Sequence, residues 1–174
     1  MRLELGIYDP FSTAWENEYY PLDLPPDWRL DYLANDYRVC VVPAQRLVGG
    51  DLACPPGLRG FIALTKASTC DVRAGLPASG WAGRVLEPDS AQAPSDLDRS
   101  VGIPAPDEAG WRWVRGEYWL VKYRVPAPFD LREIRRRIDA LEAATPADAT
   151  VLLAVDGDPN HLEQIKVMLA LLGY

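Results

Sequence analysis

The last third of the chain alternates strand and helix patterns, and this alternation constrains the fold more than any other feature. Residues 117–125 are rich in aromatic and β-branched side chains and predict a strand. Asp130 is a natural N-cap for the helix that follows, and Glu133 completes a capping box. Residues 150–155 predict a second, fully apolar strand, and a last helix stops at Gly173. Strand, helix, strand, helix in this order predicts a parallel sheet covered by helices.

Shorter elements are predicted in the N-terminal part of the chain. Three apolar runs indicate strands, at residues 3–8, 38–43 and 60–65. Residues 25–35 predict a helix. Its prolines are compatible with this prediction because they fall in the first turn, where proline is tolerated. We expect three of its side chains to face the core: Trp28, Tyr32 and Leu33.

The length of the chain fits one domain. With 174 residues and 48% hydrophobic residues, we expect a single globular α/β domain over residues 1–174. Residues 71–110 differ from the rest, because they contain five prolines, five glycines and seven alanines and little hydrophobic periodicity. This composition predicts a Pro/Gly/Ala-rich excursion from the sheet.

Charge and composition exclude several classes of partner. The net charge of −7 disfavours nucleic acid, which is bound mainly through Lys and Arg. No apolar stretch approaches the ~20 residues that span a bilayer, so no membrane contact is expected. Glu4 interrupts the first apolar stretch, which therefore does not resemble a signal peptide. The three separated cysteines suit reduced thiols. We therefore expect a cytoplasmic location.

The N-terminal residues follow an order that is similar to a known family. The order is Gly6-Ile7, Trp15, Tyr19-Tyr20-Pro21, Leu24-Pro25, Trp28, Leu30, Tyr32, Ala34 and the run 39–42. It resembles the opening of the YecE-like family of uncharacterised TIM-barrel proteins. The second strand departs from the family, because it reads Val-Cys-Val-Val where the family usually carries an acidic residue and then Asn.

The resemblance implies a fold but no established reaction. An eight-stranded barrel typically needs about 250 residues, so the resemblance implies an abbreviated or degenerate TIM-barrel-like fold. We expect a mostly parallel sheet with covering helices, completed by a second copy of the chain in a homodimer.

In such a fold a ligand is expected beyond the carboxyl ends of the strands. Trp15 lies in the loop after the first predicted strand, where an aromatic side chain would face a ligand. The candidate residues at this edge are Tyr8, Asp9, Trp15, Gln45, Lys66, Arg124 and Asp156.

Other motifs predict no metal and no cofactor. Residues 156–160 begin like a calcium loop, but His161 and Val167 occupy the positions that need glycine and glutamate. We therefore expect Asp158 or Asn160 to cap the last helix. His161 is the single histidine and is expected to be structural. The cysteines lack zinc spacing, and neither a phosphate loop nor a dinucleotide fingerprint occurs.

Two functions remain open. The favoured one is a non-catalytic domain that binds a small polar ligand or a protein partner. The alternative is a hydrolase- or isomerase-like enzyme for a small polar substrate, in which Lys66 and Arg124 stabilise negative charge and an Asp acts as base. The enzyme predicts a deep pocket with converging polar groups at the strand ends. The binding domain predicts an exposed apolar patch or a two-fold interface.

Overall fold

The computed structural model describes residues 1–47, 52–64, 80–86, 103–104, 111–115 and 118–174. One eight-stranded sheet runs through these residues in the order β4-β3-β2-β1-β8-β7-β6-β5. The strands are β1 (Arg2–Tyr8), β2 (Val39–Pro43), β3 (Arg59–Leu64), β4 (Gly83–Leu86), β5 (Ile103–Pro104), β6 (Trp111–Arg115), β7 (Tyr118–Arg124) and β8 (Thr150–Asp156).

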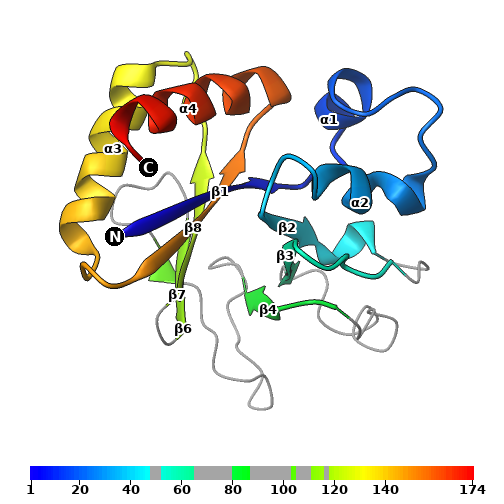
Figure 1. Cartoon of the computed structure of the whole chain (residues 1–174), viewed down its shortest axis with the longest axis horizontal. Helices are drawn as coiled ribbons and strands as arrows, with labels where there is room; N and C mark the ends of the chain where they lie inside the picture. The colour runs from blue at the N-terminus through cyan, green and yellow to red at the C-terminus, as the bar shows by residue number, and fades with distance from the viewer. Residues whose placement is uncertain (48–51, 65–79, 87–102, 105–110, 116–117) are drawn as a thin grey trace.

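Six of these strands, from β4 to β7 in the sheet order, are parallel and form a curled half-barrel (Figure 1). β6 and β5 extend one edge as antiparallel strands. The first strand, β1, lies between β2 and the last strand, β8. In a TIM barrel the first and last strands also pair, and this pairing closes the barrel. The structure thus confirms an α/β fold with a mostly parallel half-barrel sheet and covering helices.

The helices lie on the convex face of the sheet (Figure 1). They are α1 (Thr13–Glu18), α2 (Arg29–Leu33), α3 (Leu131–Ala144) and α4 (Pro159–Leu172), with 3₁₀ turns η1 (Pro26–Trp28) and η2 (Ala44–Arg46). α3 connects β7 to β8 and packs against α4. None of the helices within the described ranges combines the length and the apolar composition that crossing a lipid bilayer requires.

The core is divided by the sheet into two layers. On the convex face, alternate strand residues such as Ile7, Val121 and Val155 pack with helix residues such as Ile134 and Leu162. On the concave face, the second apolar cluster consists of strand residues: Tyr8, Val39, Val41, Phe61, Ala63, Val85, Leu120, Leu152 and Ala154.

The predicted helix ends are found in the structure. Asp130 caps α3 by accepting a hydrogen bond from the backbone N–H of Arg132. Asp158 caps α4 in the same way, and Gly173 ends it with a left-handed φ of 87°. The reciprocal half of the predicted capping box is not formed, because the Glu133 carboxylate instead pairs with arginines one turn further along α3.

The prediction for residues 25–35 is partly wrong. The 3₁₀ turn η1 precedes α2 and changes the phase of the helix. Trp28 is therefore 62% exposed, whereas Leu30 and Leu33 are buried. Of the excursion at 71–110, residues 80–86 and 103–104 contribute β4 and β5, and the remainder lies outside the described residues.

An aromatic cluster packs α1 and α2 against the sheet. Tyr19 lies at its centre, with ring centroids 5.0 Å from Trp15, 5.0 Å from Tyr20 and 6.1 Å from Tyr37. Its hydroxyl donates to Asp36 at 2.7 Å, and that of Tyr37 donates to Glu163 at 3.0 Å. Burial is the main cause that raises the pKa of Tyr19, Tyr20 and Tyr37 above the usual value.

We expect this cluster to make the protein sensitive to alkaline pH. A phenol whose pKa is raised in the folded state keeps its proton when the unfolded chain releases it, above about pH 10. The free energy of unfolding should therefore be constant below that pH and fall as the pH rises beyond it. Urea unfolding followed by circular dichroism between pH 8 and pH 11 measures the slope. Tyr19→Phe should make the fall shallower; an equal slope in this variant would contradict the assignment.

Candidate functional site

The carboxyl ends of the parallel strands meet at one edge, as the sequence predicts. Arg124 in β7 is the register partner of Asp156 in β8, and Asp156 and Tyr8 each follow a paired residue, Val155 and Ile7, on adjacent strands. The structure therefore brings together three of the predicted residues, Tyr8, Arg124 and Asp156, on the concave face.

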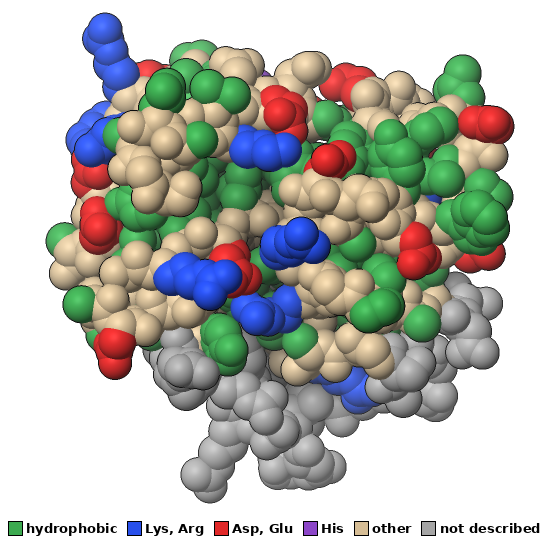
Figure 2. All heavy atoms as spheres, in the orientation of Figure 1, with side chains coloured by type: hydrophobic (Ala, Val, Ile, Leu, Met, Phe, Trp, Pro, Cys, Tyr) green, Lys and Arg blue, Asp and Glu red, His purple; other side chains and the backbone are tan. Residues whose placement is uncertain are grey.

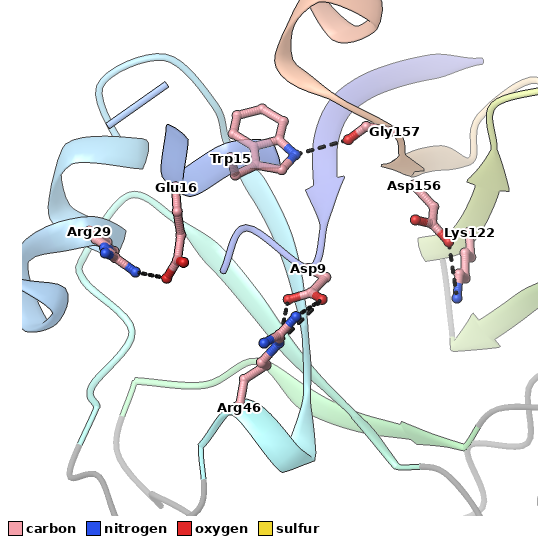
Figure 3. A network of polar contacts seen from close by, with 8 residues as sticks. All are labelled: Asp9, Trp15, Glu16, Arg29, Arg46, Lys122, Asp156 and Gly157. Atoms are coloured by element: carbon pink, nitrogen blue, oxygen red, sulfur yellow. Dashed lines mark hydrogen bonds and ion pairs between the residues drawn. The ribbon is translucent and has the colours of Figure 1, made fainter. Parts of the chain in front are cut away.

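Lys122 joins these residues, and the sequence analysis missed it. It is 7% exposed, and its Nζ lies 3.5 Å from Asp156 Oδ2 (Figure 3). The same Nζ lies 3.4 Å from the centroid of the Tyr8 ring. Arg124 Nε lies 3.6 Å from the same carboxylate oxygen. Lys122 is two residues before Arg124 and so shares its face of the strand, which is the signal that could have found it. We call Tyr8, Lys122, Arg124 and Asp156 the lysine cluster.

Asp9 forms a second charged group at the same edge. Arg46, in η2, donates from Nε and Nη2 to both Asp9 carboxylate oxygens, at 3.0 to 3.3 Å (Figure 3). Asp9 has a φ of 54°, a left-handed conformation that Asp tolerates better than most residues. Its N–H donates to the carbonyl of Val41, and its own carbonyl accepts from Ser12. The turn after β1 thus fixes the direction of the carboxylate, and the hydrogen bonds from Arg46 also raise the pKa of that arginine.

The Trp15 side chain does not face this edge of the sheet. Its side chain is fully buried in the core on the convex side. Its indole Nε1 donates to the carbonyl of Gly157 at 2.9 Å, so it joins the loop after β1 to the loop after β8 (Figure 3). The expectation of an exposed aromatic platform is corrected, because the indole finds its hydrogen-bond partner inside the molecule.

A cleft opens beside the Asp9–Arg46 pair. Its volume is about 640 Å³, within the range of ~300–1,000 Å³ that is common for small-molecule sites. It is lined by Phe11, Glu16, Pro26, Asp27, Arg29, Arg46, Leu47 and Leu52. Four of these residues are apolar and four are charged. The cleft therefore suits a ligand that has an apolar body and a polar end.

Arg29 forms the opposite charged wall of this cleft. Its Nη1 donates to Glu16 in α1 (Figure 3). Its guanidinium lies 5.5 Å from the centroid of the Tyr20 ring. Its Nε is buried and has no hydrogen-bond partner in the described part of the chain. Because solvent does not reach this atom, it is not a donor for a ligand in the cleft.

The two remaining predicted residues are not placed in either group. Gln45 is exposed in η2, next to Arg46, and makes no contact that assigns it a role. Lys66 lies outside the described residues.

The His161 side chain contacts Asp158 and Phe129. Its Nδ1 lies 2.9 Å from Asp158 Oδ2, and its ring stacks on Phe129 with centroids 4.3 Å apart. This accords with a structural histidine at the start of α4. Within the ranges that the structure describes, no group of three or more His, Cys, Asp or Glu side chains is arranged to hold a metal ion.

The charged side chains of the molecule are mixed in sign. On the face shown in Figure 2, basic side chains lie next to acidic ones rather than in a continuous basic patch.

Comparisons with protein-family models, with curated proteins and with solved structures give no match for this chain. The resemblance to the YecE-like family therefore stays a prediction.

Proposed function

We propose that this protein is a ligand-binding domain that holds a small molecule in the cleft beside Asp9 and Arg46. The ligand carries a carboxylate or phosphate group on an apolar body. The observation that carries the proposal is the presence of two arginines, Arg29 and Arg46, in the wall of a cleft of about 640 Å³ whose lining is half apolar.

Both arginines keep hydrogen-bond donors for such a ligand. Arg46 uses Nε and Nη2 on Asp9, and among the described residues its Nη1 has no partner. Arg29 uses Nη1 on Glu16. Guanidinium groups bind carboxylates and phosphates through paired N–H donors. Glu16 and Asp9 hold the two guanidinium groups in place before the ligand arrives, which lowers the cost of ordering them.

The apolar side chains of the cleft suit the apolar body of the ligand. Phe11, Pro26, Leu47 and Leu52 offer an apolar lining, and burial of apolar surface contributes ~25 cal/mol per Å². A free inorganic anion would leave this lining exposed. An organic anion uses both parts of the site.

The lysine cluster favours binding over catalysis in this proposal. The Asp156 carboxylate already forms ion pairs with two cationic side chains, Lys122 and Arg124. The hydrolase- or isomerase-like alternative instead requires an Asp that takes a proton from a substrate. The homodimer, the protein partner, the cytoplasmic location and the relationship to the YecE-like family stay predictions beside this one.

Calorimetric titration with phenyl phosphate tests the proposal, with benzyl alcohol as the uncharged counterpart. For a probe with about eleven non-hydrogen atoms, each contributing about 0.3 kcal/mol, we expect a Kd of roughly 4 mM. Arg46→Gln and Arg29→Gln should each weaken binding about tenfold, a loss of ~1.4 kcal/mol. Benzyl alcohol should bind more weakly than phenyl phosphate by a similar factor.

Arg135→Gln is the matched control, because this exposed arginine of α3 pairs with Asp139 and does not line the cleft. It should leave the affinity unchanged. The proposal is wrong if phenyl phosphate shows no saturable binding up to ~40 mM, a tenfold excess over the expected Kd. It is also wrong if all three variants bind like the parent chain while circular dichroism shows them folded.

A further inference from the structure

Two cysteines that are separate in the sequence are in contact in the structure. Cys40 lies in β2 and is fully buried, and Cys54 lies in the connection from β2 to β3 and is 6% exposed. Cys40 is the register partner of Gly60 in β3, and Cys54 Sγ lies against Gly60, so both side chains belong to the same part of the core. The thiol of Cys54 donates a hydrogen bond to the carbonyl of Leu58 at 3.3 Å. Both cysteines are free.

The chain closes tightly around Cys54, and glycines make this possible. A Cβ on Gly60 would lie 2.6 Å from Cys54 Sγ, and a Cβ on Gly80 would lie 2.3 Å from the Cys54 carbonyl oxygen. Trp81 follows Gly80 and donates from Nε1 to the carbonyl of Leu52 at 3.1 Å. The backbone on both sides therefore holds Cys54 in one position against Cys40.

The two thiols differ in their surroundings. The neighbouring Cys54 side chain and complete burial both raise the pKa of Cys40. The neighbouring Cys40 thiol and the backbone of Gly60 lower the pKa of Cys54 by more than its burial raises it. A thiolate is the nucleophile in disulfide chemistry. Cys54 is also the thiol with exposed surface, 6% against 0% for Cys40, so Cys54 is suited to attack an oxidant and Cys40 is suited to complete the reaction.

We propose that Cys40 and Cys54 form a reversible disulfide, which is a redox modification site outside the ligand cleft. The oxidant is a disulfide such as glutathione disulfide. The Cys54 thiolate attacks one sulfur of the oxidant, breaks its S–S bond and releases one glutathione thiolate, leaving a mixed disulfide. The Cys40 thiol then loses its proton and attacks Cys54 Sγ, releasing the second glutathione. Two protein thiols are oxidised, and one glutathione disulfide is reduced to two thiols.

This reaction changes the connection between β2 and β3. A disulfide needs an S–S distance of about 2.05 Å, which is shorter than a thiol hydrogen bond. The Cys54 side chain must therefore turn toward β2 when the bond forms. The proposal does not depend on the ligand of the cleft.

The test uses the full chain with Cys70→Ser, because Cys70 is the third cysteine and lies outside the described residues. The folded, reduced protein is treated with glutathione disulfide, and remaining thiols are blocked before peptide mass analysis. We expect one peptide pair linked through Cys40 and Cys54, with the loss of two hydrogen atoms, and full reversal by dithiothreitol.

Cys40→Ala in the same background tests the order of the two steps. Cys54 should then retain one glutathione, because no second thiol displaces it. In Cys54→Ala, Cys40 should stay reduced. Circular dichroism checks that each variant is folded. The proposal is overturned if the folded Cys70→Ser protein keeps both thiols free, or if Cys54 retains glutathione although Cys40 is present.

Discussion

Replacement of Trp15 by alanine is expected to lower the free energy of unfolding by about 3–5 kcal/mol. The side chain is fully buried, and it contacts the rings of Tyr19 and Tyr37 at centroid distances of 5.0 and 6.0 Å. Its removal leaves a cavity and also deprives the Gly157 carbonyl of its donor. A loss of this size is a large part of the ~5–15 kcal/mol that stabilises a typical domain.

Trp28→Ala is the matched control for Trp15→Ala, because it removes the same side chain from an exposed position. It should change stability by no more than about 0.5 kcal/mol. Trp15→Phe should lie between the two, since it keeps a ring and loses the N–H donor. Urea unfolding followed by far-ultraviolet circular dichroism measures all three. Equal losses in Trp15→Ala and Trp28→Ala would contradict the position assigned to Trp15.

Gly6→Ala is expected to disrupt the pairing of two neighbouring parallel strands, β1 and β2. Gly6 in β1 is the register partner of Val39 in β2. An added Cβ would lie 2.2 Å from the Val39 carbonyl oxygen and 2.5 Å from the Val39 Cβ. Neither atom is the end of a flexible side chain, so the backbone itself must shift. We expect a loss of about 3 kcal/mol or more in the free energy of unfolding.

Gly173→Ala provides the comparison for Gly6→Ala, because it changes a glycine that has free space. No atom lies within 4 Å of an added Cβ there, and the cost arises from the φ of 87° alone. We expect ~1–2 kcal/mol for this left-handed position. Denaturant midpoints of the two variants decide the matter: a smaller loss in Gly6→Ala than in Gly173→Ala would contradict the register of β1 and β2.

The regular part of the fold could be predicted because its signals are local. Apolar runs indicated β1, β2, β3, β7 and β8, and the end signals Asp130 and Gly173 placed the two long helices. The helix α1 has six residues and no periodic apolar face, so nothing in the sequence indicated it. The short strands β4 and β5 lie in a Pro- and Gly-rich segment whose composition is typical of loops.

The candidate site was predicted only in part, because its contacts join distant segments. The register of parallel strands was enough to bring Arg124 beside Asp156. The Asp9–Arg46 pair depends on the direction of two loops, and the cleft depends on the packing of η1 against the connection after β2. Trp15 was misread for the same reason, since its partner Gly157 is 142 positions away.

A crystal structure of the complex with phenyl phosphate is the most direct test of where the ligand binds. The account predicts density in the cleft, with phosphate oxygens within hydrogen-bond distance of the Arg29 and Arg46 guanidinium groups. The phenyl ring should lie against Phe11 and Leu47. Density for the probe at the lysine cluster, with the cleft empty, would contradict it.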